Sequence, residues 1–472
     1  MQRQSLEEYR GKVVHFIGIG GSSMSGLALL LRGAGCVVRG DDRSESHATH
    51  KLRQAGIPVT IGHDAQNVRG ADLVVYTAAI APDNVERVAC GEWNIPQMER
   101  AELLGLLADG HEPSIAVSGT HGKTTLTSML ATALLEAGRD PTIHIGGELD
   151  RIGGNVHAGT DGSFLTEACE FKASFLTLHP TLAIVTNVDA DHLDFYRDLD
   201  EIEDTFAKFL GGMREGGTAV LCADSPRALH LKDRVPVRCV TYGLDNPAAD
   251  WRAENLQHDE ALRYAFVPVR GEERLPRVAL AVPGRHNAEN ALGAAAALHE
   301  LGFSGEEIAR GLAAFAGAHR RFERTGTVQG VALYHDYGHN PAEFATVVPL
   351  GKAAAGAHRL FAVCQPHTYS RTKALFDQYL TCWDGADEVL VTDIYAAREK
   401  DPGDIHATML VKALQEAGVP AVYTPDFDAC EAYLRAHWAP GDAVLTLGCG
   451  NINLLNEQIQ RHEADKTGER AE

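Results

Sequence analysis

The stretch with the clearest chemical potential is Gly119-Thr120-His121-Gly122-Lys123-Thr124. The residues before it, Ser114 to Ser118, are short, apolar and partly β-branched, as in a buried strand. After it, leucine and methionine recur at helical spacing from Thr125 to Ala137. A glycine turn between a strand and a helix presents backbone N–H groups and the positive end of the helix dipole to an anion. The sequence therefore predicts a phosphate-binding loop.

Two side chains of this loop suit a nucleoside triphosphate. Lys123 would reach the outer phosphates, and the Thr124 hydroxyl would bind Mg²⁺. The general pattern G-x-x-x-x-G-K-[ST] has its first glycine where this chain has Val117, so the loop is a shortened variant. A chance glycine turn is the alternative, but strand, loop, lysine, hydroxyl and helix occur in the right order.

Acidic residues and a histidine follow two further predicted strands. The strand from Phe164 ends at Glu167, and the strand from Thr181 to Thr186 is followed by Asp191-His192. Such groups beside a bound triphosphate are natural Mg²⁺ ligands. Taken singly, each fits a solvated turn or a structural histidine equally well, but together they favour a metal site.

A second glycine loop follows the predicted strand Val13 to Ile17 and reads Gly18-Ile19-Gly20-Gly21-Ser22-Ser23. It is a dinucleotide-type turn whose third glycine position is Ser23. It fits NAD, FAD or any other diphosphate, and tight strand-to-helix packing is a structural alternative. Asp41 or Asp42, at the end of the next strand, could accept a hydrogen bond from a ribose hydroxyl.

Polar clusters recur further along the chain. Asn287 and Asn290 are three residues apart, so they share a helix face and could bind a nucleotide or cap the helix. Arg321 lies at a predicted domain joint, where an arginine can reach a γ-phosphate or form an interdomain salt bridge. Polar residues around His339 and Arg371 follow two predicted strands, where open parallel sheets bind ligands.

Alternating strands and helices predict parallel sheets throughout. A polar, turn-rich segment at 108–113 suggests a first domain boundary, and a third segment begins near Arg324. Residues 252–283 are less regular and predict a β-rich excursion. The third segment opens with a predicted strand from Val328 to His335.

Composition limits the class of protein. The 472 residues are 44% hydrophobic and 23% charged, and the net charge of −21 argues against unguided binding to nucleic acid or an anionic membrane. We expect no signal peptide and no membrane span, and the nine scattered cysteines suit a reduced, cytoplasmic protein.

The motifs together resemble the Mur ligases, the ATP-dependent amide ligases of peptidoglycan precursor synthesis. The resemblance rests on Gly119 to Thr124, Glu167-Ala168-Cys169-Glu170, Asp191-His192, His286-Asn287 with Asn290, and Asp336-Tyr337-Gly338-His339. It implies an α/β fold of three domains. These are a Rossmann-like UDP-sugar domain at 1–110, a central P-loop ATPase domain at 111–322 and a C-terminal Rossmann-like open sheet at 323–472 that binds the amino acid.

Within the family, His15 to Ser22, Gln365 to Thr372 and Asp393-Ile394-Tyr395 resemble the member that adds L-alanine to UDP-N-acetylmuramate through an acyl phosphate. The nearest alternative is the recycling ligase, which adds a tripeptide to the same sugar nucleotide. The implied partners are UDP-N-acetylmuramate, L-alanine and ATP, with no nucleic acid and no membrane insertion. The sequence leaves a homo-oligomer open.

The resemblance also implies a role for individual residues. Lys123, Glu167, His192 and Arg321 are the expected catalytic residues, and Thr124, Glu167 and His192 are the expected ligands of two Mg²⁺ ions. The expected ATP site is Gly119, Thr120, His121, Gly122, Lys123, Thr124, Thr125, Asn287, Asn290, Arg321 and Asp336. The expected UDP-sugar site is Gly18, Gly20, Gly21, Ser22, Ser23 and Asp42, and His339 and Arg371 are expected at the amino-acid site.

Two other classes remain as alternatives. A nicotinamide-dependent oxidoreductase would use the first glycine loop, but Ser23 and the stronger second loop count against it. A nucleotide-gated binding protein without chemistry would not need the intact set of Lys123, Thr124, Glu167 and His192.

Overall fold

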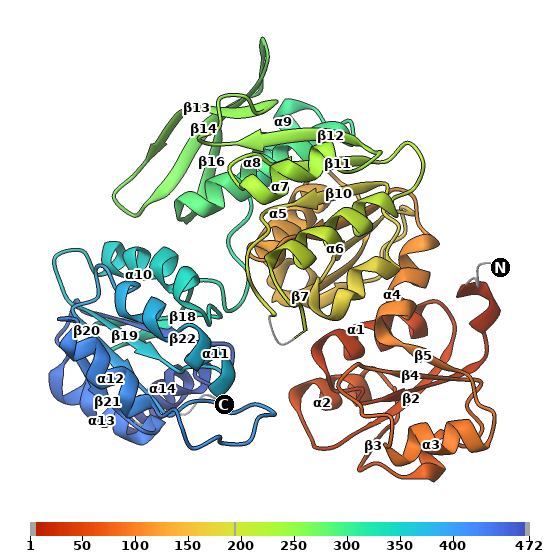
Figure 1. Ribbon diagram of the computed structural model, residues 1–472, viewed down its shortest axis with the longest axis horizontal. Helices are drawn as coiled ribbons and strands as arrows, with labels where there is room; N and C mark the ends of the chain where they lie inside the picture. The colour runs from red at the N-terminus through yellow and green to blue at the C-terminus, as the bar shows by residue number, and fades with distance from the viewer. Residues whose placement is uncertain (1–5, 193–194, 468–472) are drawn as a thin grey trace. The chain divides into compact units, whose positions relative to one another are not determined.

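The computed structural model describes residues 6–192 and 195–467, which form three β-sheets flanked by helices (Figure 1). The first sheet and most of the central sheet belong to one compact unit. The third sheet belongs to a second unit, which also includes residues 257–264 and 281–287. The predicted three-domain α/β fold is therefore present as three sheets. The predicted boundaries at 110/111 and 322/323 fall between the last strand of one sheet and the first strand of the next.

The amino-terminal sheet is parallel, with the order β3-β2-β1-β4-β5. Its strands are β1 (Val13–Ile17), β2 (Val37–Asp42), β3 (Val59–Ile61), β4 (Leu73–Tyr76) and β5 (Gln97–Glu99), and its helices are α1 (Ser22–Gly33), α2 (His47–Gln54), α3 (Val85–Glu92) and α4 (Arg100–Asp109). Short helical turns lie at η1 (Leu6–Tyr9) and η2 (Ala65–Val68). Because the strands are parallel, their carboxyl ends share one edge, where the first glycine loop follows β1.

The central sheet has eleven strands in the order β15-β14-β13-β12-β11-β10-β6-β9-β7-β8, with β16 paired to β14. The strands that position the phosphate loop are β6 (Ser114–Ser118), β9 (Phe164–Glu167) and β10 (Leu182–Val185), and β6 lies between the other two in parallel register. The remaining strands of the α/β part are β7 (Thr142–Leu149), β8 (Gly154–His157), β11 (Thr218–Cys222) and β12 (Arg238–Gly243). Its helices are α5 (Lys123–Glu136), α6 (Leu199–Gly211), α7 (Pro226–His230), α8 (Arg285–Glu300) and α9 (Gly305–Ala313), with short turns η3 (Asp150–Ile152), η4 (Phe171–Thr177) and η5 (Leu231–Asp233).

The β-rich excursion predicted for residues 252–283 is present. It consists of β13 (Trp251–His258), β14 (Arg263–Arg270), β15 (Glu273–Arg274) and β16 (Val278–Pro283), which extend the edge of the central sheet.

The third sheet has the order β17-β18-β22-β19-β20-β21 and is parallel except for the β17–β18 pair. Its strands are β17 (Glu323–Val328), β18 (Val331–Asp336), β19 (Leu360–Cys364), β20 (Glu388–Val391), β21 (Ala421–Tyr423) and β22 (Ala443–Leu447). Its helices are α10 (Pro341–Ala355), α11 (Tyr369–Ala374), α12 (Ala407–Glu416), α13 (Phe427–His437) and α14 (Asn453–Thr467), with a short turn at η6 (Phe376–Thr381).

One predicted strand is wrong. The segment from Val328 to His335 is not a single strand but the turn and second arm of the β17–β18 hairpin. Gln329 and Gly330 have φ values of 53° and 80°, the left-handed pair that a two-residue hairpin turn requires. The β-branched residues on both sides hid this turn from the sequence pattern.

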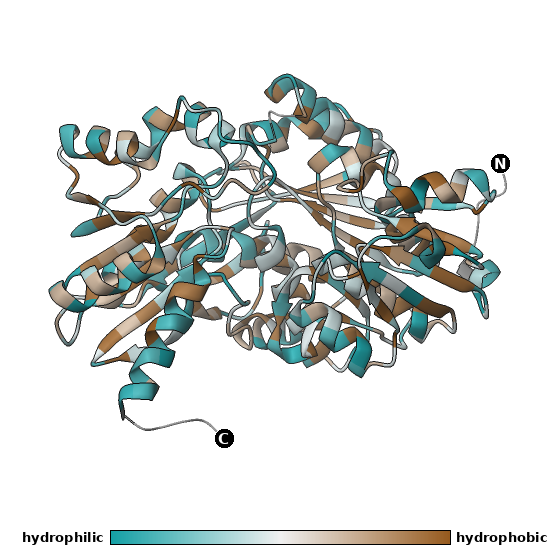
Figure 2. Ribbon diagram, turned by 90° about the horizontal axis from the view of Figure 1, so that it is seen from below, coloured by the Kyte–Doolittle hydropathy of each residue, from teal (hydrophilic) through white to brown (hydrophobic). Residues whose placement is uncertain are grey.

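Hydrophobic residues concentrate on the strands, and polar residues lie mainly on the outward faces of the helices (Figure 2). All five residues of β6, β19 and β22 are buried, as expected for strands covered on both faces. Within the described part of the chain, every helix is too short or too polar to cross a bilayer.

Candidate active site

The predicted phosphate loop joins β6 to α5. Gly119 and Gly122 have φ values of 132° and 84°, which favour glycine. A β-carbon at Gly119 would collide with the Thr186 hydroxyl, and one at Gly122 would lie 2.9 Å from Asn290 Oδ1. Gly122 is also the N-cap of α5, so it carries no side chain that could cap the first helical turn. The backbone N–H groups of that turn are therefore directed at a position where an anion can bind.

Lys123 is held inside the loop by an ion pair. Its Nζ lies 3.0 and 2.9 Å from the two carboxylate oxygens of Glu170, and it also donates to the carbonyls of Gly119 and Thr120. Burial alone would lower the pKa of Lys123, but the nearby carboxylates, Glu170 foremost, outweigh this and raise it. Lys123 is therefore protonated, and its ammonium group is held in a fixed position in the phosphate loop.

Thr124 and Glu167 lie side by side as expected of shared metal ligands. The Thr124 hydroxyl donates to Glu167 Oε2 at 3.2 Å, and Gly146 N donates to Oε1 at 2.7 Å. A hydroxyl and a carboxylate are the oxygen donors that Mg²⁺ prefers, so this pair fits the ion. His192, with a left-handed φ of 54°, places Nε2 3.9 Å from Glu170 Oε1 and stacks on Phe171. The structure thus brings all three predicted metal ligands to the edge of the loop.

The remaining loop residues are placed by Asn187, which follows β10. His121 N donates to Asn187 Oδ1 at 2.8 Å, and Thr120 N donates to the Asn187 carbonyl at 3.1 Å. Thr125 lies in the first turn of α5. These contacts fix the backbone of the loop at Thr120 and His121.

The two predicted asparagines both lie on α8 and are buried. Asn290 approaches Gly122 of the phosphate loop. Asn287 donates from Nδ2 to the Pro283 carbonyl at 2.6 Å, and its buried Oδ1 has no hydrogen-bond partner among the described residues.

Five predicted residues belong to the second compact unit: Asn287, Arg321, Asp336, His339 and Arg371. Asp336, at the end of β18, accepts from Phe322 N and Gly338 N, both at 2.7 Å. Its burial raises the pKa of this carboxyl to about 6, although Arg321 opposes the shift. Arg321 lies over the Tyr337 ring, 5.2 Å from its centroid.

His339 and Arg371 are linked by His367, at the carboxyl end of β19. Arg371 Nη1 lies 3.0 Å from His367 Nδ1, and the His339 and His367 rings are 6.0 Å apart. Burial, with help from Arg371, lowers the pKa of His367 to about 4. The neutral imidazole therefore accepts from the guanidinium and fixes its direction.

The first glycine loop is fixed by the end of β2. Gly18 N and Ile19 N both donate to the Asp41 carbonyl, and Gly20 N donates to Asp42 Oδ2 at 2.8 Å. The side chain of Asp41 is fully buried, which leaves Asp42 as the candidate for a nucleoside contact.

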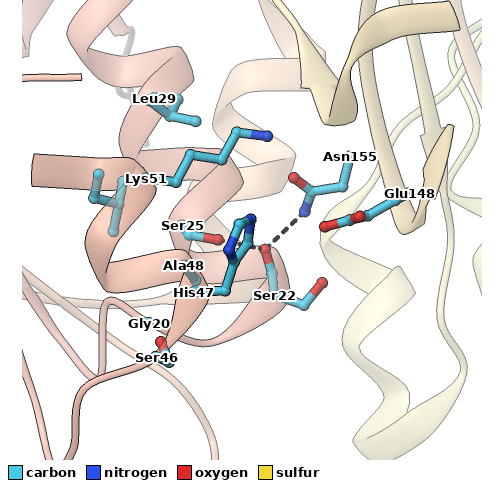
Figure 3. A pocket seen from close by; sticks show the side chains of 11 residues that line it. Gly20, Ser22, Ser25, Leu29, Ser46, His47, Ala48, Lys51, Glu148 and Asn155 are labelled. Carbon is cyan, nitrogen blue, oxygen red and sulfur yellow. Dashed lines mark hydrogen bonds between the residues drawn. The ribbon is translucent and has the colours of Figure 1, made fainter. Parts of the chain in front are cut away.

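A pocket of about 270 Å³ adjoins this loop (Figure 3). Helices α1 and α2 supply one side, with Ser22, His47 and Lys51, and Glu148 and Asn155 of the central sheet supply the other. Asn155 Nδ2 donates to the Ser22 carbonyl at 2.8 Å. His47 and Lys51 are the basic side chains of this pocket, and Glu148 is its acidic one.

Beside the pocket, Ser23 joins the two sheets of this unit. Its hydroxyl lies 2.9 Å from His144 Nε2 and accepts from Arg100 Nη1 at 3.2 Å. Burial, with Arg100 nearby, lowers the pKa of His144 to about 4, so His144 is neutral at pH 7. Ser23, at the third glycine position, thus makes a structural contact with His144 of the central sheet.

The sequence interpretation assigned no role to Glu170, His367 or His144. Glu170 and His367 stand within motifs that were recognised, three and two residues from Glu167 and Gln365. Glu170 pairs with Lys123 of α5 and His144 with Ser23 of α1, which are distant in the sequence, whereas His367 pairs with Arg371 only four residues away.

Comparison with known proteins gives three family matches that together span most of the chain. The descriptions are "Mur ligase family, catalytic domain" for residues 13–112, "Mur ligase middle domain" for 117–298 and "Mur ligase, glutamate ligase domain" for 320–450. A UDP-N-acetylmuramate–L-alanine ligase of Acetivibrio thermocellus is 44% identical over 97% of this chain and 97% of its own. The ligase of the same name from Clostridium novyi is 44% identical over 95% and 97%.

Solved structures agree. The UDP-N-acetylmuramate-alanine ligase of Thermotoga maritima matches with a TM-score of 0.83 and 27% identity, over 96% of this chain and 100% of that one. A murein peptide ligase of Psychrobacter arcticus shares the fold, with a TM-score of 0.71 and 24% identity, over 96% and 98%.

Proposed function

The chain belongs to the Mur ligase family, and on this premise we propose that it joins L-alanine to UDP-N-acetylmuramate in an ATP-dependent reaction of peptidoglycan precursor synthesis. The observation that carries the proposal is the 42–44% identity, along nearly the whole chain, to relatives that bear this activity in their names. The recycling reaction, in which a tripeptide replaces alanine, is the second candidate, favoured only by the shared fold of a murein peptide ligase.

The reaction needs an activated acyl group, because a carboxylate is a poor acyl donor. The muramoyl carboxylate attacks the γ-phosphorus of ATP to give an acyl phosphate, ADP leaves, and the alanine amine then displaces phosphate. Little covalent chemistry falls to the protein, so positioning and charge neutralisation dominate.

The phosphate loop supplies most of that neutralisation. The first turn of α5 binds the phosphates through its N–H groups, and Lys123 moves from Glu170 to the γ-phosphate. Since a Glu170 oxygen lies 3.0 Å from the Lys123 ammonium, this positive charge is already placed in the loop when ATP binds.

We propose that two Mg²⁺ ions bind here, held by Thr124, Glu167 and His192. The bound ions would neutralise the charge that develops on the transferred phosphoryl group. Glu167 is kept in place for this by the Gly146 N–H.

We assign the UDP-sugar to the first glycine loop and its pocket, and the amino acid to the cluster of His339, His367 and Arg371. The Arg371 guanidinium would pair with the alanine carboxylate, and Arg321 and Asp336 would contact ATP. We also propose a cytoplasmic location, where these substrates meet; all nine cysteines are free thiols, as expected there.

The test is phosphate release from ATP and Mg²⁺ in the presence of UDP-N-acetylmuramate, with L-alanine, glycine, L-serine or the recycling tripeptide added separately. We expect release that requires the sugar nucleotide and is fastest with L-alanine. Lys123→Met should abolish it, whereas Lys208→Ala, at an exposed position on α6, should leave it unchanged.

Turnover with the tripeptide alone would move the assignment to the recycling reaction. Absence of sugar-dependent turnover with every acceptor would remove the ligase assignment.

A further inference from the structure

A second polar cluster lies inside the amino-terminal sheet, away from the phosphate loop. His15 of β1, Asp41 of β2 and Glu86 of α3 are 2%, 0% and 0% exposed. Within the described part of the chain, this is the one place where three histidine, cysteine or carboxylate donors lie within 4.8 Å of one another. Nothing in the proposed ligation uses these side chains.

The donor atoms converge from three elements. His15 Nε2 is 2.7 Å from Asp41 Oδ2. His63, in the loop after β3, places Nδ1 2.7 Å from Asp41 Oδ1 and 2.9 Å from Glu86 Oε2. Asn67 Nδ2 donates to the other oxygen of Glu86 at 2.8 Å, which fixes the direction of that carboxylate.

Protein groups alone leave this cluster incompletely satisfied. Asp41 Oδ1 is fully buried and has no hydrogen-bond partner among the described residues, although His63 Nδ1 is close, because the angles are poor. Two buried carboxylates, those of Asp41 and Glu86, also lie within 4.8 Å of each other. A buried acceptor and a buried excess of negative charge both require a cation or a proton.

We propose that His15, Asp41 and Glu86 bind a transition-metal cation of the Zn²⁺ class, with His63 as a neighbouring hydrogen-bond donor to the carboxylates. One imidazole with two carboxylates suits Zn²⁺, Mn²⁺ or Co²⁺, whereas Mg²⁺ prefers oxygen and water. Ligands about 2.1 Å from a tetrahedral ion are roughly 3.4 Å apart. The His15–Asp41 pair, now 2.7 Å apart, would therefore open by less than 1 Å.

The ion would tie the sheet to the first glycine loop. The backbone carbonyl of Asp41 accepts from both Gly18 N and Ile19 N, so the residue that supplies a ligand also sets the loop. β1, β2 and α3 contribute one ligand each, so the metal would cross-link them at the carboxyl end of the sheet. This inference does not depend on the proposed ligation.

The test is Zn²⁺ binding to the full-length, tag-free chain after chelator treatment, measured by competition with a chromophoric chelator. Asp41→Asn and Glu86→Gln keep the side-chain shapes and remove the charge. Glu167→Gln is the matched control, since it alters the predicted Mg²⁺ site and leaves the cluster intact. Co²⁺ replaces Zn²⁺ in a second titration, and its visible absorption reports an imidazole-containing, low-coordinate site.

We expect one Zn²⁺ per chain that persists in Glu167→Gln and binds at least tenfold more weakly in both cluster variants. The Co²⁺ absorption should be lost in His15→Gln, and Zn²⁺ should raise the wild-type melting temperature. If the variants unfold, the wild-type Co²⁺ absorption still decides the question, because its absence would overturn the proposal. Zn²⁺ binding that disappears in Glu167→Gln, or that survives within twofold in Asp41→Asn, would also overturn it.

Discussion

Glu170→Gln is the most informative single change, because it separates the stability of the phosphate loop from its chemistry. The Lys123 and Glu170 side chains are 15% and 3% exposed, and both carboxylate oxygens lie within 3.0 Å of Nζ. Glutamine keeps the shape but leaves the buried ammonium without its nearest counter-charge. Breaking a buried pair costs about 3–5 kcal/mol, and the partial exposure of the lysine places this case near the lower end, at about 3 kcal/mol.

The assay is urea unfolding of the nucleotide-free chain. The unfolding transition to compare is the one that shifts in a separate experiment when ATP and Mg²⁺ are added. Lys123→Met with Glu170→Gln removes both charges, so the double variant should be more stable than the sum of the two single losses predicts. Glu215→Gln, at an exposed turn, is the control and should change stability by less than about 0.5 kcal/mol. The reasoning is wrong if Glu170→Gln matches this control, or if the two single losses simply add in the double variant.

Three further predictions concern the other parts of the site. Gly122→Ala should weaken ATP binding at least tenfold in a fluorescent-nucleotide titration, because the residue has φ of 84° and the added β-carbon would lie 2.9 Å from Asn290 Oδ1. Gly138→Ala, with φ of 76° but open space around it, is the control and should retain affinity. The pKa of His144 is near 4 when folded, so folding stability should fall as the pH drops from about 6.5 to 4, by up to about 3 kcal/mol from this residue. His144→Gln should flatten that part of the stability profile, and an unchanged acid slope would contradict the prediction. Arg371→Ala should raise the KM for L-alanine at least tenfold and leave the KM for ATP unchanged, whereas Lys373→Ala, at an exposed position, should alter neither; an equal rise for both substrates would count against an amino-acid role.

Much of the fold followed from local patterns. The strand before Gly119, the helix after it and the β-rich excursion were predictable, because buried strands are apolar and glycines mark the turns between elements. The hairpin at Gln329 was not predictable, since β-branched residues on both sides continue a strand pattern and only the backbone dihedrals reveal the turn.

Some residues of the candidate site were likewise predictable from the sequence, and others were not. Lys123 and Thr124 were predicted because their chemistry depends on adjacent residues in one loop, which the sequence determines by itself. Glu170 and the buried cluster at Asp41 depended on the tertiary structure, because their partners come from separate strands and helices. Spacing along a chain specifies which face of an element a side chain occupies, whereas packing decides which faces meet and therefore which charges are buried together.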